Sequence, residues 1–569
     1  MTPPSPGLIV ALAILLVPAT ALYHWVFARG GHISTAHLRG RSLNTPRRVR
    51  ELLSEHLAPD DPGLQFGRHR LPSRLATGHM AVIGATGSGK TLLQRLLMQS
   101  ALPLIGRGFG HRALVYDAKQ DALPILSGMT LPCPIHVLNP LAAPAVAWDM
   151  AADITSPAAA LQVASLLIPA NQRDSNPFFS NAARHLLYGA LLSLIQRRPG
   201  AWTLRDLLLI VRNPERLRTT LSGNPYTLDL LQYFEHEATM QNILSTVLTY
   251  TAPYEIIAAA WHRANGRLSL RGWLNDESIL VLGNDEANRA AIDTINQLIF
   301  KRLSELILAQ PEVPESPVHS RRTWIFLDEA RQAGRLDGLS SLMTKGRSKG
   351  AAVVLGLQDI SGLRDVYGRE VADELVGQCN TKAILRLNSP ETAAWASQLF
   401  GSREVLETRR SSSRSRNFRE AGFQAGSSSG ESVSNDIAKR DAVLESEFLD
   451  LDETTPENGL SGFFLSPVTG AFFHRIPGEW ISANLKPPSS TTPGLVPRPE
   501  THQYLLPWSP ADDKALRHPP ETEPATREET VFVFQESGCP SATPPRDRAP
   551  ESAWFPSSGP VKSVPHPTH

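Results

Sequence analysis

The residues most able to do chemistry form one short glycine-rich stretch. Residues 84–91 read Gly-Ala-Thr-Gly-Ser-Gly-Lys-Thr and satisfy the spacing G-x-x-x-x-G-K-[ST]. Glycines let successive backbone N–H groups close around a polyphosphate, the lysine reaches the β- and γ-phosphates, and the final hydroxyl holds Mg²⁺. The pattern predicts a nucleoside triphosphate site made of Gly84, Ala85, Thr86, Gly87, Ser88, Gly89, Lys90 and Thr91, with Thr91 as a metal ligand.

A triphosphatase also needs acidic groups, and an apolar run ending in two acids supplies them. Residues 324–327 read Trp-Ile-Phe-Leu and are followed by Asp328 and Glu329. We expect Asp328 to bind Mg²⁺, directly or through water, and Glu329 to act as the general base that polarises the attacking water. A strand ending in Asp-Glu is common by chance, so this assignment depends on the glycine-rich stretch.

Two later residues fit the same chemistry. Arg347 lies in a Gly-Arg-Ser-Lys-Gly turn, and Gln358 ends the apolar run 351–357. A glutamine there can sense the γ-phosphate, and an arginine on an exposed turn can act on the nucleotide of a neighbouring subunit. We therefore count both among the predicted catalytic residues, beside Lys90 and Glu329.

The order of short apolar runs and longer helical stretches predicts the fold. Strands that alternate with helices indicate a mostly parallel sheet with its ligand at the carboxyl ends of the strands, here a RecA-like α/β core. Residues 175–265 carry almost no strand pattern, so an all-helical insertion is expected to split this core. The expected strands after the glycine-rich loop are 113–116, 135–138, 278–282, 324–327, 351–357 and 383–387.

Composition limits the remaining possibilities. A chain of 569 residues with 41% hydrophobic and 20% charged residues can form two or three globular domains. Its net charge is only +1, so any positive surface for nucleic acid must be local. Cys133, Cys379 and Cys539 are too far apart to indicate a disulfide framework or a zinc site.

Residues 7–27 contain no Asp, Glu, Lys or Arg and are long enough to span a bilayer. Tyr23 and Trp25 suit the membrane interface, and the arginines that follow favour a cytoplasmic location for the rest of the chain. We predict a single-pass anchor over residues 1–30 and a connector over residues 31–75. A cleaved signal peptide is the alternative, because Ala19-Thr20-Ala21 resembles a cleavage site.

Several further motifs, in register, resemble the TraD/TraG-type coupling proteins of type IV secretion and conjugation. The resemblance extends over about residues 70–476. The motifs that carry it are Asp117-Ala118-Lys119, Leu138-Asn139-Pro140, Trp148-Asp149, Asn176-Pro177-Phe178-Phe179, Ala183-Arg184, Leu336-Asp337-Gly338-Leu339, the turn 346–350, Gly356-Leu357-Gln358-Asp359 and Val366-Tyr367-Gly368.

The resemblance implies an ATPase of the bacterial inner membrane, assembled as a ring of six subunits. Such a ring would pass relaxase-bound single-stranded DNA of the relaxosome to the channel proteins of a type IV secretion system. A coupling ATPase that recruits effector proteins, or an FtsK-like pump of double-stranded DNA, remains an alternative. Many relatives carry two transmembrane helices around a periplasmic domain, whereas this sequence shows one candidate span.

Two segments depart from the family pattern. Residues 408–434 are rich in serine and arginine and are expected to form a flexible loop, which either contacts DNA phosphates or is a tolerated insertion. Residues 477–569 are rich in proline and are expected to be a disordered tail. The nucleotide-binding domain is accordingly predicted in two parts, residues 76–174 and 266–476.

Overall fold

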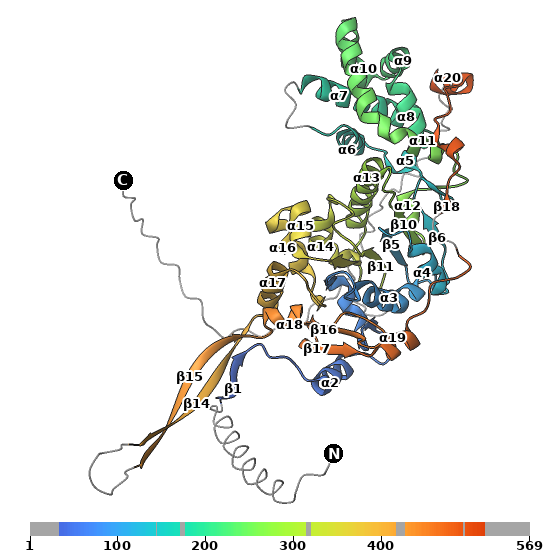
Figure 1. Cartoon of the computed structure of the whole chain (residues 1–569). Coiled ribbons are helices and arrows are strands. Elements are labelled where there is room, and N and C mark those ends of the chain that lie inside the picture. The colour runs from blue at the N-terminus through green and yellow to red at the C-terminus, as the bar shows by residue number, and fades with distance from the viewer. Residues whose placement is uncertain are drawn as a thin grey trace, which may run out of the picture. The chain divides into compact units, whose positions relative to one another are not determined.

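A nine-stranded sheet organises the chain. The computed structural model describes residues 33–143, 145–170, 177–314, 320–416, 427–492 and 496–517. The strand order is β17-β16-β13-β4-β12-β11-β5-β10-β6, and all strands from β13 to β6 are parallel (Figure 1). This confirms the predicted α/β class with a mostly parallel sheet. The strands are β4 (Met80–Ile83), β5 (His111–Asp117), β6 (Ile135–Val137), β10 (Ile279–Gly283), β11 (Arg322–Leu327), β12 (Ala351–Leu357), β13 (Thr381–Ile384), β16 (Leu460–Ser466) and β17 (Gly470–Ile476).

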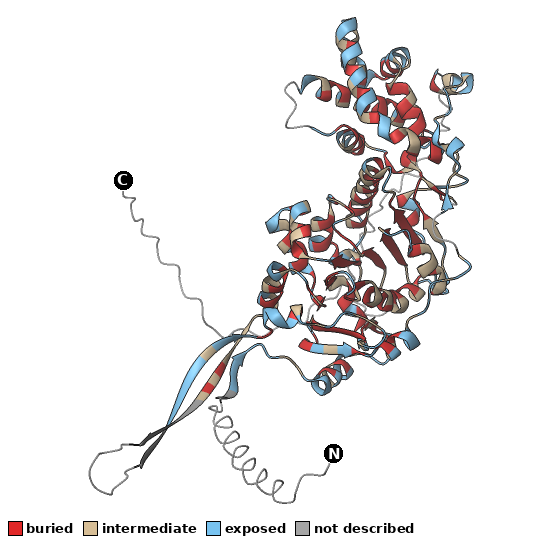
Figure 2. Ribbon diagram, in the orientation of Figure 1, coloured by how far each residue is buried: buried red, intermediate tan, exposed pale blue. Residues whose placement is uncertain are grey.

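Apolar side chains point to both faces of the central strands, because helices cover both faces. In β4, Ala81 and Ile83 belong to one hydrophobic cluster, and Met80 and Val82 belong to the other. Figure 2 shows these strands as buried. The helices that follow the strands are α3 (Lys90–Ala101), α4 (Ala122–Gly128), α13 (Arg289–Leu308), α14 (Leu339–Lys345), α15 (Ile360–Tyr367), α16 (Arg369–Gln378) and α17 (Pro390–Phe400).

Between β6 and β10 the chain leaves the sheet and forms helices. Strands β8 (Ala147–Trp148) and β9 (Arg267–Leu268) pair in parallel where the chain leaves and returns. From residue 177 to residue 262 the described chain contains only helices and turns, in the region expected to be an all-helical insertion. The helices between β8 and β9 are α5 (Met150–Asp153), α6 (Pro157–Leu167), α7 (Phe178–Arg197), α8 (Leu204–Val211), α9 (Pro214–Ser222), α10 (Glu237–Thr251) and α11 (Glu255–His262), with 3₁₀ segments η3 (Pro225–Phe234) and η4 (Ala252–Tyr254).

The predicted membrane anchor, residues 7–27, lies outside the described residues. Within the described part, the continuous helical stretch Glu237–His262 is the one segment long and apolar enough to cross a bilayer. Its residues Met240, Ile243 and Val247 are buried in the core cluster of the insertion. A core helix of a globular domain passes the same test, so this stretch does not indicate a second anchor.

Residues 31–75 were expected to be a connector, part of which could pair with a sheet as an edge strand, whereas from residue 33 onward the described chain is folded. The segment forms β1 (Ile33–Gly40), α2 (Pro46–His56), β2 (Leu64–Phe66), β3 (His69–Leu71) and the 3₁₀ turn η1 (Ser73–Gly78). Val49, Phe66 and Leu71 are fully buried or nearly so. The prolines that suggested a connector are compatible with this structure, because Pro46 lies in the first turn of α2, where the missing N–H costs nothing.

The serine-rich segment 408–434 was expected to be a flexible loop, whereas its described residues, 408–416 and 427–434, form strands. Strands β14 (Ser402–Arg416) and β15 (Ser427–Asp441) pair in antiparallel register from Ser402–Asp441 to Arg416–Ser427. Strand β1 pairs with β14, so these strands form a separate sheet in the order β1-β14-β15. Residues 417–426 lie outside the described part. Backbone pairing needs few apolar side chains, which is why composition alone missed these strands.

Residues 477–517 were predicted to begin a disordered tail, whereas the described chain is folded there. It contains α19 (Gly478–Asn484), β18 (Val496–Pro497), the 3₁₀ turn η6 (Glu500–Gln503) and α20 (Pro510–Arg517). The first part of this segment packs against α3 and α4. Arg95 of α3 donates to Lys486 O at 2.7 Å, and Ser489 N donates to Pro124 O of α4 at 2.9 Å. Strand β18 then pairs with β7 (Ala142–Ala143). Residues 518–569 lie outside the described part.

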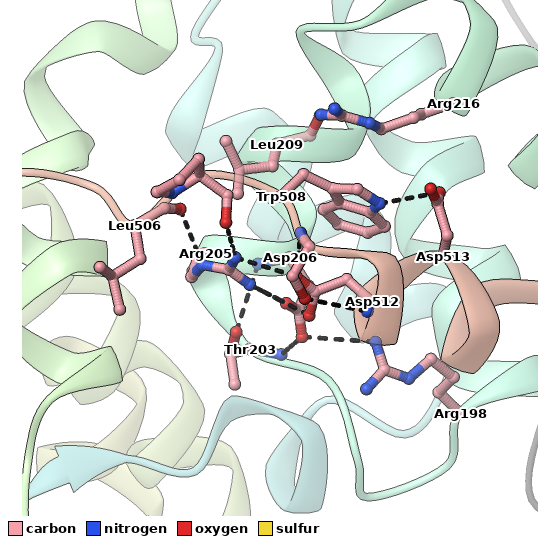
Figure 3. Close-up of polar contacts among 12 residues, drawn as sticks. Arg198, Thr203, Arg205, Asp206, Leu209, Arg216, Leu506, Trp508, Asp512 and Asp513 are labelled. Atoms are coloured by element: carbon pink, nitrogen blue, oxygen red, sulfur yellow. Dashed lines mark hydrogen bonds and ion pairs between the residues drawn. The ribbon is translucent and has the colours of Figure 1, made fainter.

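The segment ends on the helical insertion, where Arg205 of α8 holds it (Figure 3). This guanidinium is almost fully buried, donates to the carbonyl oxygens of Leu506 and Pro507 at 3.0 and 2.5 Å, and pairs with Asp512 at 3.0 Å. Nearby, Arg216 lies over the ring of Trp508, 4.9 Å from its centroid. Partial burial opposes the charge of Asp512, but hydrogen bonds from Arg205 and Ser509 lower its pKa to about 2.

We expect Arg205→Met to release this segment from α8. Removing one partner of a buried ion pair costs about 3 kcal/mol, and methionine cannot donate to the two carbonyls. Hydrogen exchange of residues 500–517 should therefore speed up, while exchange in β11 should be unchanged. Arg218→Met, on the neighbouring α9 and outside these contacts, is the matched control. Equal protection of residues 500–517 in wild type and Arg205→Met would contradict this role of Arg205.

Candidate nucleotide site

The glycine-rich loop lies between β4 and α3, as its spacing requires. Gly87 and Gly89 have φ values of +77° and +90°, which side chains with a Cβ rarely adopt. A Cβ on Gly84 would lie 2.4 Å from Ser88 Oγ, so this position also excludes larger residues. Helix α3 begins at Lys90 without a side-chain cap. Its first N–H groups are therefore available to an anion, as in other phosphate-binding loops.

The acidic pair meets this loop, although it is distant along the chain. Strand β11 ends at Leu327, and Asp328 follows at the carboxyl edge of the sheet. The Thr91 hydroxyl donates to Asp328 Oδ2 at 3.0 Å. The second oxygen, Asp328 Oδ1, is buried and has no hydrogen-bond partner among the described residues. A hydroxyl and a carboxylate side by side are hard oxygen ligands, so this donor set fits Mg²⁺.

The Lys90 side chain is folded back over its own loop. Its Nζ donates to Gly84 O at 2.8 Å and to Ala85 O at 3.4 Å. Burial lowers the pKa of Lys90, and the nearby charges of Glu329 and Asp328 only partly oppose this effect. The ammonium group is thus held at the loop, where phosphate oxygens can replace the carbonyl oxygens.

Gln358 contacts the predicted base. Its Nε2 donates to both carboxylate oxygens of Glu329 at 3.3 Å. Gln358 follows β12, the neighbour of β11, so the two residues end adjacent parallel strands. Glu329 is 6% exposed, whereas Gln358 is exposed. The amide therefore orients a buried carboxylate from the solvent side.

Arg347 lies elsewhere. It belongs to the 3₁₀ turn η5 (Arg347–Lys349), which precedes β12, whereas the glycine-rich loop follows the carboxyl end of the parallel strand β4. The length of β12 therefore separates Arg347 from the loop. Its side chain is exposed and could serve only a site on another copy of the chain.

The sequence interpretation missed Lys119 as a site residue. Its Nζ lies 3.1 Å from Asp328 Oδ2, 3.3 Å from Thr91 Oγ1 and 3.8 Å from Glu329 Oε1. Burial alone would lower the pKa of Lys119, but the two carboxylates outweigh burial and raise it. The available sequence signal was the motif Asp117-Ala118-Lys119, whereas the position of β5 beside β11 is visible only in the structure.

The sequence interpretation also missed residues of the segment before β16 that contact the glycine-rich loop. Thr454 N donates to Gly87 O at 3.1 Å, and a Cβ on Gly87 would lie 2.7 Å from Glu453 Oε1. Arg386, which follows β13, lies 3.9 Å from the same carboxylate and accepts from Ala85 N through its backbone oxygen. No local motif marks these residues, so their approach to the loop is visible only in three dimensions.

The family model and the curated relative that match this chain both describe coupling proteins. Residues 64–464 match the family described as type IV secretion-system coupling protein DNA-binding domain. The chain is 24% identical over 411 residues to the coupling protein TraD of Escherichia coli strain K12, which covers 70% of this chain and 54% of that protein. The chain thus spans about half the length of this curated relative.

Solved structures share the fold. The unbound form of the bacterial conjugative coupling protein TrwBΔN70 aligns with a TM-score of 0.60 at 20% identity, covering 82% of this chain and 97% of that one. The plasmid coupling protein TrwB in complex with ADP and Mg²⁺ aligns with a TM-score of 0.59 at 21% identity, covering 82% and 99%. TrwB in complex with a non-hydrolysable ATP analogue gives 0.60 at 21%, covering 83% and 99%.

Proposed function

The chain belongs to the type IV secretion-system coupling protein family, and from this premise we propose that it is an ATPase that drives conjugative transfer of single-stranded DNA. The contact between Thr91 and Asp328 carries the proposal, because it joins the phosphate-binding loop to the acidic pair. The TrwB structures with an ATP analogue and with ADP and Mg²⁺ support ATP and Mg²⁺ as its ligands.

The positions of five side chains support a hydrolytic step. Lys90 donates to the β- and γ-phosphates once it leaves the carbonyls of its loop. Thr91 and Asp328 would hold Mg²⁺, and the ion would supply charge neutralisation on the phosphates. Glu329 accepts the proton of the attacking water as that water's oxygen bonds to the γ-phosphorus, and Gln358 keeps this carboxylate oriented. The bond to the β,γ-bridging oxygen then breaks, which releases ADP and phosphate.

A ring of six copies would explain why Arg347 lies away from the nucleotide loop of its own chain. The residue is exposed at the edge of the sheet away from its own loop, so it can complete the charge stabilisation only at the site of a neighbour. We place this ring at the bacterial inner membrane, anchored by one N-terminal span per chain. The relaxase-bound strand of the relaxosome would pass through its centre to the type IV secretion channel proteins.

The substrate can be tested with the full chain in detergent. We expect single-stranded DNA to raise the kcat of ATP hydrolysis several-fold at low salt, and we expect the stimulation to fall steeply as salt rises, because phosphate contacts release counterions. Lys90→Ala measures the background rate, and duplex DNA of equal length is the control nucleic acid. Stimulation by duplex alone would indicate a double-stranded DNA pump. Indifference to both would indicate an effector-recruiting ATPase and overturn the DNA proposal.

A further inference from the structure

A basic cavity lies outside the nucleotide site, between α2, β3 and β17. We call it the α2 pocket. Its volume is about 440 Å³, and its arginine and histidine lining comes from Arg50 of α2, from Arg68, His69 and Arg70 at the β2–β3 hairpin, and from His474 of β17. Helix α2 contacts β3 and also β17, which is labelled near it in Figure 1. Asn44 N, just before α2, donates to Ala471 O at 2.7 Å. The walls are therefore parts of one packed unit.

The arginines of this pocket have no acidic partners. Among the described residues, no carboxylate lies within 4.0 Å of Arg50, Arg68 or Arg70, and none lines the cavity. By contrast, Arg47 and Arg48, on the same helix but outside the pocket, both pair with Glu51. Positive charge that the protein leaves uncompensated in one concave place favours an anion there.

Two histidines add to this anion preference. The rings of His69 and His474 lie 4.4 Å apart between centroids, and His474 Nε2 is buried without a hydrogen-bond partner among the described residues. Burial lowers the pKa of His474 to about 3, helped by His69 and Arg68, and burial with Arg68 and Arg50 also lowers the pKa of His69. Both rings are thus neutral at pH 7, and each can donate one N–H to an acceptor.

We propose that the α2 pocket binds the phosphate headgroup of an anionic phospholipid. Arg50 and Arg68 would hold the phosphate, for which guanidinium groups are well suited. Leu53 and Leu57 form an apolar part of the same lining and would contact the glycerol and the first acyl carbons. The pocket thus combines a cationic and an apolar surface, as an amphiphile requires.

The position of the pocket in the chain favours a lipid over a nucleic acid. Helix α2 begins at Pro46, shortly after the predicted span ends at Phe27, and the intervening segment is rich in arginine. Basic segments beside a membrane span bind anionic headgroups. A nucleic-acid strand presents a row of phosphates and needs an extended groove. Here the three arginines without acidic partners, Arg50, Arg68 and Arg70, line one cavity.

Binding can be measured without ATP, on the full chain in a non-ionic detergent. Water-soluble dihexanoyl-phosphatidylglycerol is titrated by calorimetry, with dihexanoyl-phosphatidylcholine, inorganic phosphate and a single-stranded oligonucleotide as comparison ligands. We expect saturable binding of the phosphatidylglycerol, which Arg50→Gln combined with Arg68→Gln weakens by about tenfold or more. The matched control combines Arg47→Gln with Arg48→Gln, which removes the same charge beside the pocket and should leave the affinity unchanged.

Each outcome decides the proposal. Loss of affinity in the pocket variant alone, with weaker binding of phosphatidylcholine, supports it. Equal loss of affinity in both double variants would show that the binding depends on general surface charge and not on the pocket. Inorganic phosphate binding as tightly as the lipid would indicate a free-anion site, and displacement by the oligonucleotide would indicate a DNA contact. Any of these three results overturns the lipid proposal, and none affects the ATPase proposal, which rests on turnover at Lys90 and Glu329.

Discussion

Glu329→Gln is expected to lower the kcat of ATP hydrolysis by about 10²–10⁴-fold, the usual contribution of a positioned general base. Glutamine keeps the shape of the side chain and can still contact Gln358, which now donates to both oxygens of Glu329. It cannot accept the proton of the attacking water. Nucleotide binding, measured with a fluorescent ATP analogue in the presence of Mg²⁺, should therefore change little while turnover stops.

The matched control is Glu286→Gln, which makes the same replacement at an exposed residue paired with Arg289. Glu286 does not contact the glycine-rich loop, so its variant should turn over ATP like the wild type. If Glu329→Gln kept most of the wild-type kcat, another group would have to be the base, and the assignment of the acidic pair would be wrong.

Lys90→Ala should have a comparable effect for a different reason. Removing a preorganised cation from a site of developing negative charge costs about 10²–10³-fold in kcat/KM. Unlike Glu329→Gln, this change should also weaken nucleotide binding, because the ammonium contacts the phosphates before and during the reaction. Steady-state kinetics together with binding titrations separate the two variants.

The fold should survive this replacement. Among the described residues, Lys90 Nζ donates hydrogen bonds only to carbonyl oxygens of its own loop, and burial already lowers its pKa. The thermal unfolding midpoint should therefore be close to that of the wild type. Lys345→Ala, at an exposed position in the last turn of α14, is the control for loss of a lysine charge. Full activity of Lys90→Ala would contradict the site.

Local patterns sufficed to predict the parts of the site that lie on single strands. The glycine-rich loop and Asp328 were predicted because a strand, its loop and its acids are contiguous in sequence. Lys119 was missed as a site residue because its role depends on β5 lying beside β11, and strand order is not a local property. Glu453 and Thr454 were missed for the same reason, since they approach Gly87 only because β16 lies beside β13, the neighbour of β4.

The errors at 408–434 and 477–517 share one cause. Residues 408–434 are poor in apolar side chains and residues 477–517 are rich in proline, and composition therefore favoured disorder in both segments. Strands β14 and β15 are instead held by backbone pairing with each other and with β1. The later segment is held largely through its carbonyl oxygens, which accept from Arg205 and from Arg263 of the helical insertion. Acceptors on the backbone carry no sequence signature.

The pairing of β1 with β14 has a practical consequence for soluble versions of this protein. The strand of residues 33–40 is covalently close to the predicted anchor, yet it covers one edge of a strand 15 residues long. A truncation that removed the anchor together with β1 would uncover the N–H and C=O groups along that edge. Uncovered edges recruit other chains into intermolecular sheets. A shortened protein that begins before Ile33 avoids this source of aggregation.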